Sequence, residues 1–228
     1  MKPTYKDYLE GTRRILELST LEKVPYRTVV SGREFIVYPN VFSPKYFHDT
    51  EIFAQHLPVR HGEELLEIGP GTGAISITAV YEGAVKVVAI DINSDAVRNT
   101  QANIELHQVQ KRVEVRHGNV YDALKQGETF DTIFWNMPFG FVETNNASDL
   151  DRAVFDSQYR STERFIKESK RHLKHNGRVL IGFSSTLGRL DLLEQFCKAA
   201  KLELRLLYKE QSEETYPVTF EMFEAKPK

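Results

Sequence analysis

The feature that most constrains the fold is a regular alternation of strand-length apolar runs with helical segments, which begins at Glu64. These runs and segments follow one another at 64–68, 73–83, 85–91, 94–108, 112–117 and 129–135. Strands that are apolar on both faces and are joined through helices are typical of parallel sheets covered on both sides. The sequence therefore predicts an α/β fold with a Rossmann-like, doubly wound and mostly parallel sheet.

The last part of the chain changes this pattern. A helix is expected at 158–175, a strand at 178–183 and a helix near 188–200, but the final segments LELRLLYK and VTFEMFEA are separated only by EQSEETYP. That connection is too short for a helical crossover, so the two strands should pair antiparallel and one strand of the sheet should be reversed. Residues 136–157 lack clear periodicity, and so long a connection is typical of a lid, a binding loop or disorder.

The residues before the regular alternation form a smaller unit. Apolar residues between Thr4 and Leu21 recur with helical spacing, REFIVY at 33–38 alternates as strands do, and Asp49 can cap a helix at 50–57. We therefore expect an N-terminal extension at 1–48, made of a helix and short strands, and a main domain at 49–228.

Composition excludes several classes of protein. No apolar run approaches the roughly 20 residues of a membrane-spanning helix, and the N-terminus is polar, so the sequence predicts a cytoplasmic protein without a membrane contact. Cys197 is the only cysteine, which excludes an intramolecular disulfide and a cysteine-based zinc cluster. The net charge of −2 gives no overall attraction to nucleic acid, so such binding would require a local patch.

A glycine-rich turn follows the first regular strand. Glycines at 69, 71 and 73 let the backbone bend sharply and let a ligand approach it closely. The pattern is compatible with two cofactors. Gly69, Gly71 and Ala74 fit the dinucleotide pattern G-x-G-x-x-A, whereas Glu67 together with the three glycines gives the acid-x-G-x-G-x-G spacing of adenosylmethionine sites.

The ends of the next two strands carry further candidates. Asp91 ends the second strand, twenty positions after Gly71, where an acid can accept hydrogen bonds from both ribose hydroxyls of an adenosine. Asn119 and Val120 follow the third strand, where the adenine should lie, although a simple turn explains them equally well. These residues predict nucleoside binding without naming the nucleoside.

The fourth strand ends in Asn136-Met137-Pro138-Phe139, beside the expected ligand crevice. Proline keeps the preceding residue extended, which fixes the direction of the Met137 carbonyl. The Asn136 side-chain oxygen and this carbonyl could each accept one hydrogen of a planar NH2 group, while Phe139 stacks on the flat substrate. Away from such a crevice, the same four residues would be read as a turn.

Together these motifs resemble the class I S-adenosylmethionine-dependent methyltransferases that carry an N-P-P-Y/F motif, and most closely the HemK-type subgroup. The resemblance runs over about 35–200 and includes a lead-in, FSPKYFHDTEIF, that contains Thr50-Glu51. It continues, in the order typical of the family, through EIGPGTGAI, VVAIDIN, RHGNV and FDTIFWNMPF.

The resemblance implies S-adenosylmethionine as cofactor and no metal. Glu67 would lie near its amine, the three glycines beneath its amino-acid part, Asp91 at the ribose and Asn119 at the adenine. Asn136, Met137, Pro138 and Phe139 would then form the acceptor site. The remaining expected cofactor contacts are Thr50, Ile92 and Val120.

HemK-type enzymes methylate a glutamine side-chain amide in translation release factors, and relatives with the same motif methylate exocyclic amines of adenine or guanine. The resemblance therefore implies a protein substrate such as a translation factor, or alternatively an RNA or DNA base. Three departures from the family are visible: Met137 replaces a usual proline, Asn119 replaces a usual aspartate, and 140–156 lacks the bacterial family's sequence.

Two rivals remain at this stage. A nicotinamide-dependent oxidoreductase is supported by G-x-G-x-x-A and Asp91, and a non-catalytic binding module by Met137 and Asn119. A basic stripe on the helix expected at 158–175 is more typical of a solvated helix face than of a nucleic-acid site. It consists of Arg160, Arg164, Lys167, Arg171 and Lys174.

Overall fold

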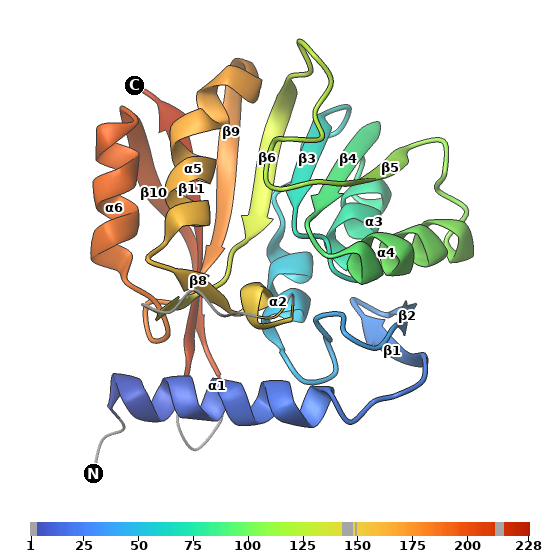
Figure 1. Ribbon diagram of the computed structural model, residues 1–228. Helices are drawn as coiled ribbons and strands as arrows, with labels where there is room; N and C mark the ends of the chain where they lie inside the picture. Colours follow the sequence, from blue (N-terminus) through green and yellow to red (C-terminus); the bar gives the residue numbers. More distant parts are fainter. Residues whose placement is uncertain (1–3, 143–147, 149, 213–216) are drawn as a thin grey trace.

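The computed structural model describes residues 4–142, 148, 150–212 and 217–228. Its centre is a seven-stranded sheet with the strand order β10-β11-β9-β6-β3-β4-β5 (Figure 1). The bounds are β3 (Glu64–Ile68), β4 (Lys86–Asp91), β5 (Val113–His117), β6 (Phe130–Asn136), β9 (Leu173–Phe183), β10 (Leu202–Gln211) and β11 (Thr219–Pro227). The pairs among β3, β4, β5, β6 and β9 are parallel, whereas β11 is antiparallel to β9 and β10. The predicted Rossmann-like sheet with a reversed C-terminal strand is confirmed.

Helices flank this sheet and bury their apolar faces on it. Their bounds are α2 (Asp49–His56), α3 (Ala74–Tyr81), α4 (Ser94–Leu106), α5 (Arg160–Glu168) and α6 (Leu190–Ala199). Helix α5 is strongly two-sided, because Phe165 and Ile166 are fully buried while most of its charged residues face outward. Helices α5 and α6 lie side by side in front of the sheet in Figure 1, and α2 packs against α3.

The N-terminal residues form helix α1 (Tyr5–Ser19) and a hairpin of β1 (Tyr26–Val30) and β2 (Arg33–Val37). Thr4 and Asp7 form a capping box that fixes the start of α1, as expected for this spacing of hydroxyl and acid. The helix lies across the end of the sheet at which the parallel strands finish (Figure 1). The predicted helix and the strand at 33–38 are confirmed, while β1 was not predicted.

The hairpin is attached to α4 by two buried asparagines. The side-chain oxygens of Asn103 and Asn99 accept from the backbone N–H groups of Ile36 and Tyr38, both at 2.8 Å. Asn103 also donates to the carbonyl of Thr72, at 2.9 Å, in the glycine-rich turn. Part of the N-terminal extension is therefore fixed directly to the residues of the expected cofactor site.

The helix predicted at 158–175 is shorter than expected. It ends at Glu168 and is followed by a 3-10 turn, η2 (Ser169–His172), and β9 begins five residues before the predicted strand. The register between β6 and β9 shifts between Phe130 and Thr132, and Asn176 in the shifted segment has φ of +63°. This irregular pairing allows β9 to begin at Leu173, and no periodic pattern in the sequence predicts the early start.

The connection at 136–157 contains more regular structure than predicted. It includes β7 (Gly140–Val142), the 3-10 turn η1 (Asp151–Ala153) and β8 (Phe155–Ser157), and β7 pairs with β8 in parallel. A Cβ on Gly140 would lie 2.4 Å from Cδ1 of Phe155, so the close pairing depends on glycine. Residues 143–147 and 149 of the expected loop lie outside the described part of the chain.

Candidate active site

A cavity of about 320 Å³ lies at the carboxyl ends of β3, β4 and β6. This is the position at which ligands bind in open α/β sheets. Most of the residues predicted from the sequence line it: Thr50, Glu67, Gly69, Gly71, Asp91, Ile92, Asn119, Val120, Asn136 and Pro138. The structure therefore brings together residues from five segments that are distant in sequence. Gly73, Met137 and Phe139 do not line this cavity.

The three glycines of the turn all have positive φ, but each lies next to a different residue. A Cβ on Gly69 would lie 3.1 Å from Nε1 of Trp135, and one on Gly73 would lie 2.9 Å from Cγ2 of Thr100 on α4. Gly73 thus allows close helix packing rather than contact with a ligand. A Cβ on Gly71 would lie 3.9 Å from Phe42, an ordinary contact, so the backbone there is open toward the cavity.

Glu67 is a buried acid in the wall of the cavity, with 2% of its surface exposed. Ser76 on α3 donates a hydrogen bond to its carboxyl group. Burial raises the pKa of Glu67 to about 8, against the hydrogen bonds from Ser76, and the neighbouring charge of Asp91 adds to the increase. A buried carboxyl with such a pKa favours a cationic partner, because a nearby positive charge stabilises its ionised form.

Asp91 organises the turn as well as facing the cavity. Its Oδ2 accepts from the backbone N–H of Gly71 at 3.1 Å, and its Oδ1 accepts from that of Asn93 at 2.9 Å. The cap of α4 is instead provided by Asn93, whose side-chain oxygen accepts from the N–H of Asp95 at 2.8 Å. Asp91 therefore lines the cavity without acting as the cap of α4.

Asn119 and Val120 line the cavity after β5 in a strained turn. Val120 has φ of +54°, a left-handed conformation that is a genuine outlier for a β-branched residue. Arg164 of α5 donates to the Asn119 carbonyl at 3.2 Å and also pairs with Asp122. Backbone strain of this kind is concentrated at functional sites, where the surroundings hold it in place.

Asn136, the last residue of β6, is hydrogen-bonded to Asp49, the first residue of α2. Its Nδ2 donates to Oδ2 of Asp49 at 2.7 Å. Among the described residues, neither Oδ1 of Asn136 nor Oδ1 of Asp49 has a hydrogen-bond partner, and both atoms are buried. We call these two oxygens the open acceptors. Because a carboxylate accepts only, the bond to Asp49 fixes the amide so that its oxygen is the open atom.

This use of Asp49 corrects the prediction that it caps the helix at 50–57. The N-cap position is occupied by His48, without a side-chain hydrogen bond, and Asp49 is the first helical residue. Burial raises the pKa of Asp49, against the hydrogen bond from Asn136. Asp49 and Asn136 are 87 positions apart, so no local pattern connected them.

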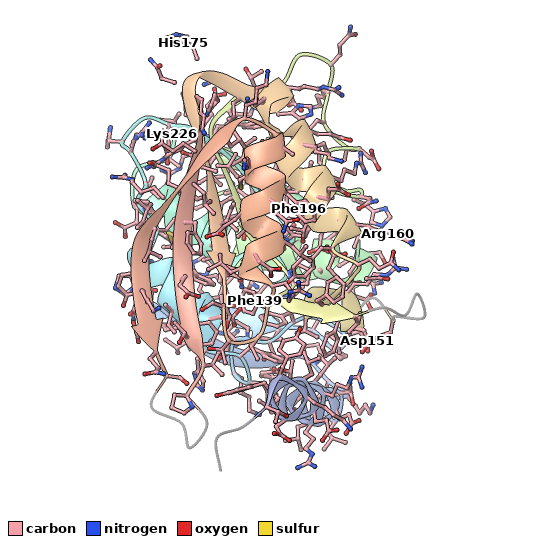
Figure 2. The ribbon with its side chains drawn as sticks, turned by 90° about the vertical axis from the view of Figure 1, so that its left-hand side faces the viewer. Phe139, Asp151, Arg160, His175, Phe196 and Lys226 are labelled. Atoms are coloured by element: carbon pink, nitrogen blue, oxygen red, sulfur yellow. The ribbon has the colours of Figure 1, made fainter. Side chains whose placement is uncertain are left out.

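A second cavity, of about 90 Å³, adjoins the first. Both are lined by Phe42, Ala153 and Phe155, and the second lies between α1 and the residues that follow β6. Met137 and Phe139 line this second cavity, and Figure 2 shows Phe139 at the same end of the sheet as Arg160 at the start of α5. The other residues around it are mostly apolar, including Leu9, Ile15, Phe47, Leu187, Val218 and Phe220, and Asp49 lies among them.

The loop after Asn136 is fixed from several sides. The ring of Phe139 packs against Phe183 and Phe220, with centroids 6.2 Å apart in each pair. Tyr159 donates from its hydroxyl to the carbonyl of Phe139 and accepts from the N–H of Arg189 at 3.0 Å. Met137, which replaces a usual proline, is only 1% exposed, so packing holds this position instead of a second pyrrolidine ring.

Asp156 is a cavity residue that was not predicted. It lies in β8 with 5% of its surface exposed, and its Oδ2 accepts from both the N–H and the hydroxyl of Thr162 at 2.8 Å. Asp156 thus caps α5 from a position before the helix. It falls in a stretch without periodicity, and an acid six residues before a threonine is not a recognised capping spacing, so the sequence carried no signal for it.

Arg160 of the basic stripe lines the first cavity, whereas the other four residues of the stripe line neither cavity. In the basic stripe, Lys167 pairs with Glu163, Arg164 pairs with Asp122 and Glu168, and Lys174 pairs with Glu64 and Asp131. His175 lies at the opposite end of the molecule from Phe139 (Figure 2).

The described residues contain no group of three or more His, Cys, Asp or Glu side chains placed to hold a metal ion. No helix within them has the length and apolar character needed to span a membrane.

Comparison with known proteins places the chain in a family. The methyltransferase small domain family matches residues 32–205. A release factor glutamine methyltransferase of Aquifex aeolicus is 32% identical over 183 residues, which are 73% of this chain and 63% of the relative. A putative protein N5-glutamine methyltransferase of Methanocaldococcus jannaschii is 29% identical over 172 residues, 73% of this chain and 83% of that protein. The chain thus spans less than two thirds of the Aquifex relative.

Among solved structures, a 16S rRNA N2 G1207 methyltransferase of T. thermophilus, in complex with AdoMet and guanosine, is similar with a TM-score of 0.65 and 19% identity. The similarity covers 90% of this chain and 50% of that one and concerns the fold. The family match decides between the two cofactor classes that the glycine pattern left open, against the nicotinamide-dependent oxidoreductase. The chain belongs to the methyltransferase small domain family, within the class I S-adenosylmethionine-dependent methyltransferases that its motifs resemble.

Proposed function

We propose that the protein transfers a methyl group from S-adenosylmethionine to a planar NH2 nitrogen, and that this nitrogen belongs to a glutamine side-chain amide of a protein substrate. The observation that carries the proposal is the open acceptor of Asn136, a buried oxygen on a residue that lines the first cavity and is hydrogen-bonded to Asp49 of the second. Buried polar atoms are normally hydrogen-bonded, so an open one in this position favours a ligand with a donor.

The residues of the first cavity fit the cofactor. The buried carboxyl of Glu67 suits an amine, the open backbone at Gly71 allows a close approach, and the carboxylate of Asp91 suits a pair of ribose hydroxyls. Asn119 and Val120, with Ile92, would then surround the adenine. Thr50 lines the same cavity at the start of α2. These roles agree with what the resemblance implied, and they remain proposals.

Asn136 has a defined task in this reaction. S-adenosylmethionine supplies a methyl group that is already activated on a sulfonium, so the protein has mainly to align a nitrogen with it. Oδ1 of Asn136 accepts one N–H of the substrate and becomes a stronger partner as positive charge develops on the nitrogen. The Met137 carbonyl and the ring of Phe139, predicted from the sequence as second acceptor and flat packing surface, belong to residues that line the second cavity.

A protein amide is favoured over a nucleic-acid base by the second cavity and by charge. That cavity is small and mostly apolar, which suits a side chain with a methylene stem and a terminal amide. Three residues of the basic stripe, Arg164, Lys167 and Lys174, pair with acidic neighbours, and the net charge is −2. The two glutamine methyltransferases among the relatives support the same choice. An exocyclic base amine in RNA or DNA remains the alternative.

The N-terminal extension at 1–48 has a place in this proposal. Helix α1 contributes Leu9, Thr12 and Ile15 to the second cavity, and the hydroxyl of Tyr5 accepts from the N–H of Phe141 at 3.2 Å. We therefore propose that the extension acts as a lid over the acceptor site, while 49–228 forms the methyltransferase domain.

The test is methyl transfer from labelled S-adenosylmethionine to separated protein and RNA fractions of a cell lysate. We expect label in protein that survives nuclease treatment and is recovered as N-methylglutamine. Asn136→Ala should reduce transfer by about 100-fold while the affinity for S-adenosylhomocysteine stays within about twofold. Label recovered only in nucleic acid would replace the protein substrate with the base. Unchanged transfer by Asn136→Ala would remove this side chain from the reaction.

A further inference from the structure

The side chain of Asp49 is not explained by any role described so far. It is 4% exposed, it lines the second cavity, and only its Oδ2 is used, by the amide of Asn136 at 2.7 Å. Its Oδ1 is the second of the two open acceptors, in a wall that is otherwise mostly apolar. Burying a carboxylate oxygen without a hydrogen-bond donor costs free energy. A ligand that places an N–H or O–H donor against this oxygen would offset that cost.

The two open acceptors belong to side chains that are bonded to each other. Asn136 lines the cofactor cavity, Asp49 lines the second cavity, and their hydrogen bond crosses the boundary between the two. An NH2 group has two N–H donors, and a methyl acceptor must lie at this boundary for its nitrogen to meet the sulfonium methyl. The pair therefore offers two oxygens to one NH2 group at the place where transfer has to occur.

We propose that Oδ1 of Asp49, in place of the Met137 carbonyl, accepts a hydrogen bond from the NH2 group of the acceptor and takes the proton that its nitrogen loses, an inference that rests on the proposed function. In this step the N–CH3 bond forms and the S–CH3 bond breaks, and the electron pair of the broken bond stays on sulfur. The nitrogen would carry a positive charge after transfer, and the release of its proton to Oδ1 of Asp49 restores a neutral amide. Asp49 is thus a catalytic residue in contact with the substrate, beside Asn136.

Two features of the structure suit this role. Burial raises the pKa of Asp49, which makes its carboxylate a better proton acceptor than an exposed aspartate. Gly182 of β9 lies opposite Asn136 in the sheet, and a Cβ there would come within 3.1 Å of Oδ1 of Asn136. Glycine at this position leaves the amide oxygen room against β9.

The substitutions Asp49→Asn and Asp49→Ala separate contact with the substrate from positioning of Asn136. In Asp49→Asn, the new side-chain oxygen can still accept from Asn136, while its NH2 replaces the open acceptor with a donor. Asp49→Ala removes both functions. We expect both variants to lower the single-turnover rate with a glutamine-containing peptide by about 100-fold. Asp131→Asn, at the amino end of β6, is the matched control and should retain the wild-type rate.

A binding measurement accompanies the rate. Calorimetry on the protein loaded with S-adenosylhomocysteine should show tenfold weaker binding of the glutamine peptide to both Asp49 variants, with the affinity for S-adenosylhomocysteine within about twofold. The same peptide with glutamate, which lacks the NH2 group, is the reference for non-specific binding.

The outcomes distinguish this inference from the proposed function. If the wild type methylates the peptide and Asp49→Asn does so at a similar rate, the role of Asp49 is overturned and the proposed function stands. Loss of transfer in Asp49→Ala alone would reduce Asp49 to a positioning residue for Asn136. If the wild type neither binds nor methylates the glutamine peptide above the glutamate reference, both proposals fail together.

Discussion

The two cavities of the candidate active site are built from different kinds of sequence. The first cavity is lined mainly by residues at the carboxyl ends of parallel strands and in the turns after β3, β4, β5 and β6. The second cavity combines helix α1, the segment that follows β6 and the end of the C-terminal hairpin, and Tyr8 and Pro217 in this region are joined by a hydrogen bond across 209 positions.

This difference assigns separate tasks to separate parts of the chain. The strand ends are fixed by the buried sheet, which gives the cofactor side a rigid frame that many acceptors can share. The second cavity is enclosed mainly by segments outside the central sheet, with Phe220 of β11 as an exception. We therefore expect substitutions at the first cavity to change cofactor affinity or stability, and substitutions at α1 to change only the use of the acceptor.

The largest effect is expected at Asp91. Asp91→Ala removes the acceptor of the N–H groups of Gly71 and Asn93 together with the proposed ribose contact. Since a hydrogen bond to a charged group contributes about 1.5–3 kcal/mol, the affinity for S-adenosylhomocysteine should fall by about 100-fold. Calorimetry measures this directly.

Asp95→Ala, in the first turn of α4, is the control for Asp91, because it removes a nearby acid that does not line the cavity. Equal losses of affinity in the two variants would show a general effect of charge, and Asp91 would lose its assigned role.

A smaller effect, on stability, is expected at Gly73. Gly73→Ala places a methyl group on a residue with φ of +80°, at 2.9 Å from Cγ2 of Thr100. Left-handed strain and the close contact together should lower the free energy of unfolding by about 2 kcal/mol in urea titrations.

Two variants test this explanation of Gly73. Gly127→Ala shares the positive φ, at +78°, but has no described atom within 4 Å of the added Cβ, so it should lose less stability. Thr100→Ser removes Cγ2 and keeps the hydroxyl that donates to Gly71, and it should recover part of the loss in the double variant. If Gly73→Ala and Gly127→Ala lose the same free energy of unfolding, the whole effect is due to backbone strain and the contact with Thr100 contributes nothing.

The same contrast explains what could be predicted from the sequence. The glycine turn, Asp91 and Asn119 were identifiable because a strand followed by a turn is a local pattern whose place in a parallel sheet follows from general rules. The hydrogen bond between Asp49 and Asn136 joins two residues that are 87 positions apart, and local sequence patterns do not predict such a contact. The early start of β9 likewise depends on an irregular pairing with β6, which is a tertiary property.

A further effect is a dependence of stability on pH. The folded-state pKa of Glu67 is raised from 4.5 to about 8 by burial, so the proton stabilises the folded protein. This stability is fully present below about pH 4.5 and is lost as the pH rises toward about 8. Without cofactor, the wild type should lose about 1.4 kcal/mol of unfolding free energy per pH unit from this group, and Glu67→Gln should lack that slope.

Urea titrations at pH 5, 6, 7 and 8 test the contribution of Glu67. The two stability curves should converge at low pH and diverge as the pH rises, with the variant more stable. Parallel curves would show that Glu67 is already ionised in the folded protein. Glu114→Gln is a suitable control, because the Arg116 ion pair holds the pKa of Glu114 down at about 2 and leaves it ionised throughout this range.

The smallest effect separates the cavities most directly. Leu9→Ala and Ile15→Ala shorten two partly buried side chains of α1 that line the second cavity. Because a buried methylene contributes about 0.8 kcal/mol, each change should raise KM for the acceptor by only a few fold. Leu18→Ala, on the same helix but 52% exposed, is the matched control. The affinity for S-adenosylhomocysteine should not change in any of the three. A loss of cofactor affinity in Leu9→Ala or Ile15→Ala would show that the two cavities are energetically coupled and that α1 also supports the cofactor side.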